Sequence, residues 1–229
     1  MILFRALRRV LFAIVLFGVS GFVLGSYYFD YLFPFDLGRE PNTLTNFHLS
    51  SLKGEPERCF AALDRAGIDY RRVMPLERED GCGYADAVRI TGAGVQYAGG
   101  VTLRCPAMLA LLMWERHALL PAAQNFLKRK AISVRHLGTY ACRPVMGRKG
   151  RALSQHAFAN AIDVAAVALE GGQTVSVLRD WEDSGAKGEF LRALRAGACR
   201  IFNATLSPDY NAAHNNHFHF DLGRWRVCR

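Results

Sequence analysis

The chain has 229 residues and a formal net charge of +9, the balance of 29 basic and 20 acidic residues. The basic residues are spread along the sequence instead of forming a stripe, which argues against a nucleic-acid-binding surface. Eight prolines without a repeat exclude a polyproline rod, and the length is that of one domain with a short appendage.

The appendage is N-terminal, where Arg5, Arg8 and Arg9 precede an uncharged apolar run over residues 10–28. This is about the length that a helix needs to cross a bilayer, and the arginines would stay in the cytoplasm. We therefore expect residues 1–30 to be a single-pass inner-membrane anchor, with the C-terminal domain in the periplasm. The alternative is a cleavable signal peptide, whose apolar region is usually shorter and ends at a small-x-small site.

Residues 31–56 predict a linker, because they mix Pro, Asn, Thr, Ser and Gly without a period. A single domain over residues 57–229 would follow. Within it, residues 148–151 (RKGR) are a local basic cluster. We interpret this cluster as a solvated loop or, alternatively, as an attractor of an anionic polymer or of acidic lipids.

All six cysteines lie beyond the apolar run, and an exported domain can keep disulfides. The even number predicts three bridges, with buried free thiols as the alternative, and sequence alone does not fix the connectivity. We favour a bridge between Cys199 and Cys228, because the helix before the last strand should pack beside it. The cysteines are Cys59, Cys82, Cys105, Cys142, Cys199 and Cys228.

The predicted elements of the domain are short helices and strands in a mixed order. Helices are expected where apolar residues recur three or four apart, over residues 55–66, 106–119, 121–128 and 189–202. Strands are expected over residues 87–90, 94–103, 132–140, around 163, and over 174–177 and 217–221. This order predicts an α+β fold, a small antiparallel sheet flanked by helices on one side.

Two stretches hold four of the seven histidines: residues 154–163 (SQHAFANAID) and residues 214–221 (HNNHFHFD). Alternation in the second predicts a strand with His217, His219 and Asp221 on one face and two phenylalanines on the other. Together with His156 and Asp163, these residues supply imidazole and carboxylate groups from separate rigid elements. Such a donor set suits a catalytic zinc, which has three protein ligands and an open position.

The order Ser-x-His, Ala-x-Asp, His-x-His resembles the zinc peptidase group that includes lysostaphin-type enzymes, D-Ala-D-Ala metallopeptidases and hedgehog domains. A closer resemblance is to the bacterial extensin-like C-terminal family, which shares this signature. Further features of that family match residues 139–143 (TYACR), 198–202 (ACRIF) and 206–211 (LSPDYN). The resemblance extends over roughly residues 59–228.

The resemblance implies that His156, Asp163 and His219 bind Zn²⁺. His217 then corresponds to the histidine that acts on the water or the oxyanion. Arg143 corresponds to the basic residue near the scissile carbonyl or a substrate carboxylate, although a salt bridge at a strand end is an equal alternative.

Three further polar residues have two interpretations each. Ser154 would bond near the metal or cap the turn before the first motif. His214 would touch the substrate or cap the strand. Asp221 would orient a zinc-bound imidazole.

Two positions depart from the related patterns. Asn216 occupies the place of the catalytic Glu of the D-Ala-D-Ala dipeptidases, so the base role would fall to His217. Ala159 replaces the usual Gly, which adds a methyl group and restricts φ.

The function implied by the resemblance is that of a membrane-anchored periplasmic zinc metallopeptidase that hydrolyses peptide bonds of peptidoglycan. The alternative is a non-catalytic, zinc-containing cell-wall-binding domain, for which hedgehog domains are the precedent. A His-rich nuclease is disfavoured by the alternating strand and the lack of a basic stripe. The expected partners are peptidoglycan and the membrane; the sequence indicates neither the cleaved bond nor the oligomeric state.

Overall fold

The computed structural model describes residues 34–148 and 150–229, together with residues 8, 12, 15, 18 and 21. Residues 37–229 form one compact unit. The predicted anchor or signal peptide, residues 1–30, lies almost entirely outside the described residues. Among the residues that are described, no helix has both the length and the apolar character needed to cross a membrane.

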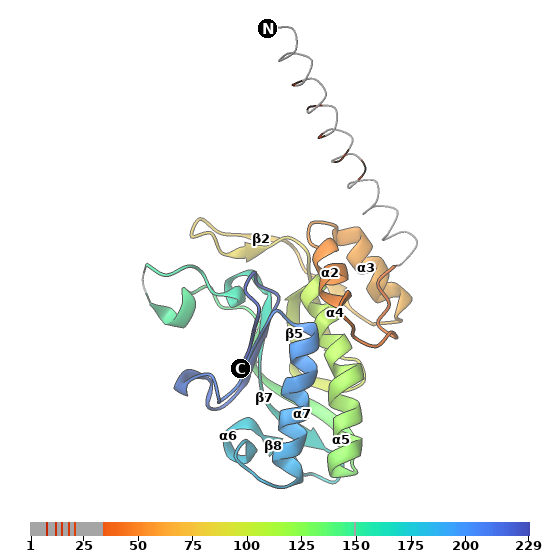
Figure 1. The fold of residues 1–229 in the computed structure, drawn as a ribbon, viewed down its shortest axis with the longest axis vertical. Coiled ribbons are helices and arrows are strands. Elements are labelled where there is room, and N and C mark those ends of the chain that lie inside the picture. Colours follow the sequence, from red (N-terminus) through yellow and green to blue (C-terminus); the bar gives the residue numbers. More distant parts are fainter. Residues whose placement is uncertain are drawn as a thin grey trace. The chain divides into compact units, whose positions relative to one another are not determined.

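A nine-stranded, mostly antiparallel sheet forms the centre of this unit, with the order β1-β4-β5-β6-β7-β10-β9-β11 and with β8 beside β7 (Figure 1). Its strands are β1 (Arg71–Arg72), β4 (Ala87–Gly92), β5 (Gln96–Arg104), β6 (Ala131–Gly138), β7 (Ala161–Leu169), β8 (Thr174–Ser176), β9 (Ala204–Leu206), β10 (Phe218–Asp221) and β11 (Val227–Cys228). A separate hairpin contains β2 (Leu76–Glu77) and β3 (Gly83–Tyr84).

The α+β class is confirmed, but the sheet is neither small nor wholly antiparallel. β5 pairs with β6 in parallel, and β9 pairs with β11 in parallel. The first of these pairings has a clear cause: the helical connection over residues 105–127 carries the chain back along the sheet, as a parallel crossover requires.

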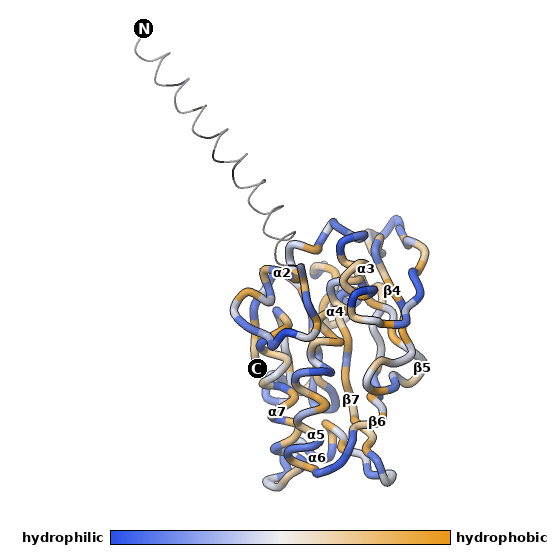
Figure 2. Tube along the Cα trace, turned by 90° about the vertical axis from the view of Figure 1, so that its right-hand side faces the viewer, coloured by the Kyte–Doolittle hydropathy of each residue, from blue (hydrophilic) through white to orange (hydrophobic). Residues whose placement is uncertain are grey.

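The helices α4, α5 and α7 gather on one face of the sheet (Figures 1 and 2). The α-helices are α2 (Thr45–Ser51), α3 (Pro56–Arg65), α4 (Cys105–Trp114), α5 (Leu120–Leu127), α6 (Val177–Asp180) and α7 (Ala186–Ile201). Short 3₁₀ turns are η2 (Val145–Gly147), η3 (Gln155–Phe158) and η4 (Ala212–His214). A π-helical turn, η1 (Glu115–Leu119), joins α4 to α5.

The π turn explains why one continuous helix stands where two were predicted. Pro121 has no N–H, and in a regular α-helix its ring would clash with the carbonyl four residues earlier. Widening the turn relieves that clash, and the N–H of Leu120 accordingly donates to the carbonyl of Glu115, five residues back.

The same turn supports two close contacts. The buried Glu115 carboxylate accepts hydrogen bonds from the N–H of Gly94 and from the hydroxyl of Tyr97. These bonds join the helix to β5 and to the turn before β5.

The helix α7 crosses the π-helical turn closely on its other side. A Cβ added at Gly197 would lie 2.3 Å from the Cβ of Ala118.

The core between helices and sheet contains the aromatic face of β10, as the alternation predicts. Phe218 and Phe220 are fully buried. Phe220 packs edge-on against Trp114 of α4 and stacks on Phe202, while Phe218 contacts Trp181. β7 is hydrophobic along most of its length (Figure 2). The opposite face of β10 is therefore free to present its polar side chains away from the helices.

All six cysteines form disulfides, which confirms the three predicted bridges. The pairs are Cys59–Cys105, Cys82–Cys142 and Cys199–Cys228. The third pair is the one that the packing of α7 beside the end of the chain predicts.

The segment expected to be a linker includes the helix α2. Leu49 and Leu52 are buried against the domain. The carbonyl of Leu37 contacts the Nε2 atom of His117 at 2.8 Å, and the ammonium of Lys53 donates to the carbonyl of Leu222 at 2.9 Å. Residues 37–56 are thus packed as part of the compact unit rather than extended between two parts of the chain.

Candidate metal centre

Strands β7 and β10 place two of the predicted ligands side by side. Asp163 and His219 are direct partners in the antiparallel register. The third ligand, His156, lies on the 3₁₀ turn η3, where the Ser154 hydroxyl caps the turn by accepting from the His156 N–H. The turn ends at Ala159, whose φ of 49° is left-handed, so the turn that favours Gly is retained at a cost of about 1–2 kcal/mol.

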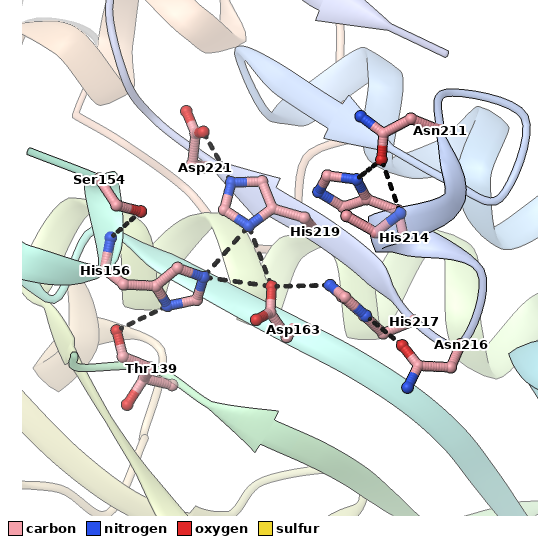
Figure 3. Close-up of polar contacts among 11 residues, drawn as sticks. Thr139, Ser154, His156, Asp163, Asn211, His214, Asn216, His217, His219 and Asp221 are labelled. Atoms are coloured by element: carbon pink, nitrogen blue, oxygen red, sulfur yellow. Dashed lines mark hydrogen bonds and ion pairs between the residues drawn. The ribbon is translucent and has the colours of Figure 1, made fainter. Parts of the chain in front are cut away.

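Three ligand atoms from these residues form a nearly equilateral triangle (Figure 3). The Nε2 atom of His156 lies 3.1 Å from both the Oδ1 atom of Asp163 and the Nδ1 atom of His219, and the last two are 2.9 Å apart. A tetrahedral zinc ion with bonds of about 2.0–2.1 Å holds its ligand atoms about 3.3 Å apart. The triangle therefore has nearly the size of one face of such a tetrahedron.

Hydrogen bonds on the far side of each imidazole determine which nitrogen faces this triangle. The Nδ1 atom of His156 contacts the carbonyl of Thr139 at 3.3 Å, and the Nε2 atom of His219 contacts Oδ2 of Asp221 at 2.9 Å. Both partners only accept hydrogen bonds, so these nitrogens carry the protons. In the neutral imidazoles, two lone pairs and a carboxylate oxygen therefore converge on one point, which favours a cation there.

The electrostatics of the metal-free site agree with this need for positive charge. Burial would lower the pKa of His219, but hydrogen bonds to the carboxylates of Asp163 and Asp221 outweigh it and raise the pKa to about 9. Burial would likewise raise the pKa of Asp163, but His156 and His219 lower it below its ordinary value. A proton on Nδ1 of His219 then occupies the position that a metal ion would take.

Two more histidines line the same side of the site, each held by an asparagine. His217 lies with Nε2 at 3.6 Å from Oδ1 of Asp163, while its Nδ1 contacts Oδ1 of Asn216 at 2.7 Å. His214 contacts Oδ1 of Asn211 through Nδ1 at 2.8 Å. Each amide oxygen accepts the Nδ1 proton, which leaves the Nε2 lone pair of both rings free.

The two imidazoles are neutral near neutral pH. Burial lowers the pKa of His217, and the charges of His219, His156 and Arg143 add to this against the opposing Asp163. Burial, followed by the neighbouring His219 and His217, lowers the pKa of His214 to about 4. Both rings can therefore accept hydrogen bonds.

Arg143 lies at the edge of the site with an exposed side chain. Its charge reaches both His214 and His217, whose pKa values it lowers. Its backbone carbonyl accepts from the N–H of Ser154, and the preceding Cys142 is bridged to Cys82. In the basic cluster nearby, Arg148 and Arg151 are exposed, while residue 149 lies outside the described residues.

The structure thus brings together six of the predicted residues, namely His156, Asp163, His214, His217, His219 and Asp221. Ser154 caps η3 instead of facing the triangle. The site also includes Thr139 and Asn211, which sequence reasoning did not assign, and Asn216, which it identified only as the replacement of a catalytic Glu. A second group with metal-like spacing, Asp80, Cys82 and Cys142, is excluded because both of its sulfurs are in a disulfide.

The profile of one protein family, described as the extensin-like protein C-terminus, matches residues 57–229. The chain belongs to this family. The matched range covers the sheet, all three disulfides and every residue of the candidate metal centre, so the extensin-like domain and the compact unit largely coincide. No curated protein and no solved structure matches the chain significantly.

Proposed function

We propose that this extensin-like domain is a zinc-dependent peptidase that hydrolyses peptide bonds of peptidoglycan, and that residues 1–30 anchor it in the inner membrane with the domain in the periplasm. The observation that carries the proposal is the triangle of two imidazole nitrogens and one carboxylate oxygen. A His217 ring with a free Nε2 atom lies directly beside it.

The donor set fits zinc in type, number and spacing. His156, Asp163 and His219 would hold the ion, and one position would stay open. Bound there, zinc would supply Lewis acidity toward a water molecule and toward the amide carbonyl. Asp221 would keep His219 in the orientation that binding requires, and the carbonyl of Thr139 would do the same for His156.

The residues of the chain then have separate tasks in hydrolysis. Nε2 of His217 takes the proton of the attacking water as the new C–O bond forms, and Asn216 holds the ring in the required tautomer. The same nitrogen returns the proton to the leaving amine when the C–N bond breaks. Arg143 donates to the carbonyl oxygen or to a substrate carboxylate through its planar guanidinium.

The proposed relation to lysostaphin-type and D-Ala-D-Ala peptidases rests on the shared motif.

One observation favours the second candidate, a non-catalytic zinc-containing wall-binding domain. Asn216 offers no carboxylate where the dipeptidases have their catalytic Glu, and the two carboxylates near the triangle, those of Asp163 and Asp221, are both engaged with imidazoles. In that case the site would be structural.

The decisive test is incubation of the oxidised, zinc-loaded protein with purified peptidoglycan sacculi, followed by mass analysis of the released fragments. The peptidase proposal expects new amine and carboxylate ends that are absent with the His217→Ala variant. Sacculi that retain the protein but release no fragment would support the binding domain instead.

A further inference from the structure

Two partly exposed segments lie side by side, the helix α2 and the loop over residues 222–226. Their contact is made by Asn46, whose side-chain oxygen accepts from Nη2 of Arg226 at 3.1 Å once its amide is oriented to satisfy both neighbours. Lys53, just after α2, donates to the carbonyl of Leu222 at 2.9 Å. The two segments are therefore in direct contact, and we call them together the α2 face.

This surface exposes large apolar side chains. Leu44 and Phe47 are about half exposed, at 50 % and 48 %, and Trp225 is 75 % exposed. The other two tryptophans, Trp114 and Trp181, are buried. The apolar area that these side chains expose to water costs free energy, which a partner surface would recover.

The charge on the surface is positive. Residues 222–229 contain three arginines and no acidic residue. The guanidinium of Arg224 lies 5.7 Å from the centre of the Trp225 ring, and Arg226 is held by the contact with α2. Tryptophan, phenylalanine and leucine combined with arginine are the residues that prefer the boundary between acyl chains and anionic headgroups.

We propose that the α2 face docks on a bilayer that contains anionic phospholipid. The aliphatic and aromatic side chains would enter the headgroup boundary, and Arg224 and Arg226 would contact phosphates. The proposal rests on the envelope location proposed above, but not on peptidase activity. The chain between Tyr28, the end of the apolar run, and Leu37, the first residue of the compact unit, can span at most about 30 Å. An inserted apolar run would therefore hold this surface within reach of the bilayer and raise its effective concentration there.

Docking would also fix the height of the metal centre above the membrane. The N–H of Gly223 donates to Oδ1 of Asp221 at 2.7 Å, and Oδ2 of the same carboxylate contacts His219. The loop that would touch lipid is therefore joined by two hydrogen bonds to a predicted zinc ligand, and the site would sit at a constant distance from the surface.

Trp225 is the probe for the test, because it is the one exposed tryptophan of the three in the sequence. The full chain is reconstituted into vesicles with brominated acyl chains, with or without anionic lipid, and the tryptophan emission is compared with that of the Trp225→Phe variant. Quenching of the Trp225 component in anionic vesicles is the expected result. Arg224→Gln with Arg226→Gln should lower the ratio of docked to undocked molecules roughly 30-fold.

The matched control carries Arg135→Gln and Arg179→Gln, two exposed arginines on β6 and α6, and should be quenched like the unchanged chain. Leu44→Ser with Phe47→Ser should reduce quenching without unfolding the domain, since both positions are exposed. An unquenched Trp225 in anionic vesicles overturns the proposal. A second quenching experiment uses the soluble quencher acrylamide with added glycan strands. If the glycan strands protect Trp225 from acrylamide, while brominated lipid does not quench it, the surface binds wall polymer instead. Neither result depends on zinc or on hydrolysis, so the peptidase proposal is tested separately.

Discussion

Zinc binding to the metal-free protein should release about one proton at pH 7.5, because the proton and the metal compete for the same triangle. The pKa of His219 in the metal-free site is about 9, so its imidazole is almost fully protonated at about pH 7.5. Zinc requires the Nδ1 lone pair and displaces that proton.

Isothermal titration calorimetry in buffers of different ionisation enthalpy measures this release. The observed enthalpy, plotted against buffer ionisation enthalpy, should have a slope of about one near pH 7.5 and a smaller slope as the pH approaches 9. Asp221→Asn removes one of the carboxylates that hold the proton, so the slope should fall and zinc affinity should weaken by about 10–100-fold. A slope near zero for the unchanged protein at neutral pH would refute the competition.

The same proton affects folding. The folded pKa of His219, about 9, lies above the value of about 6.5 expected in the unfolded chain. This pKa difference contributes about 3 kcal/mol to the free energy of unfolding. The contribution is fully present below about pH 6.5 and is lost as the pH rises through about 9. Urea unfolding of the metal-free protein should show this loss, and His219→Gln should remove it. Equal loss in that variant would assign the pH dependence to other groups.

Three further predictions concern the site and its scaffold. His219→Ala should abolish stoichiometric zinc, whereas His217→Ala should keep zinc and lose hydrolysis; metal analysis and the sacculus assay separate them, and the reverse pattern would exchange their roles. Gly197→Ala should lower the free energy of unfolding by about 1–3 kcal/mol in urea, because the added methyl group meets Ala118, although Ala is the better helix former. Unchanged or higher stability would show that α7 can move away from the π-helical turn. Burial raises the pKa of Glu115, so the contribution of its protonated form to the free energy of unfolding is present below about pH 4.5 and is lost as the pH rises. Glu115→Gln should flatten this pH dependence in urea unfolding between about pH 4 and 7. An unchanged pH profile in the variant would contradict the prediction.

The sequence predicts the parts of the site whose signals are local. The alternation of residues 217–221 predicts both faces of β10, because one face meets the helices and the other does not. The donor set follows from side-chain type and order, since imidazole and carboxylate are what zinc binds. Pairing of Cys199 with Cys228 follows from the packing of one helix beside the end of the chain.

The remaining features depend on tertiary placement. Thr139 acts through its backbone carbonyl, which any residue could supply, and Asn211 and Asn216 act from turns without a period. The parallel pairing of β5 with β6 has no local sequence signal, because the residue pattern of a strand does not show whether its neighbour runs parallel or antiparallel. The helix α2 is short and contributes only one buried leucine beside a buried threonine, with a second buried leucine at its C-cap, which is too few for a clear apolar stripe.

The disulfide connectivity constrains how the domain can be oxidised. Cys59–Cys105 and Cys82–Cys142 are interleaved, since each bridge encloses one cysteine of the other. In a chain that crosses a membrane from its N-terminus, neighbouring thiols meet first, and joining them in order would give Cys59–Cys82, a non-native pair. Native pairing then requires either that oxidation waits for the later cysteines or that thiolates attack and reshuffle the early bridge. A compartment that oxidises thiols in their order of arrival, and does not exchange them afterwards, would trap such a chain with non-native disulfides before the sheet could form.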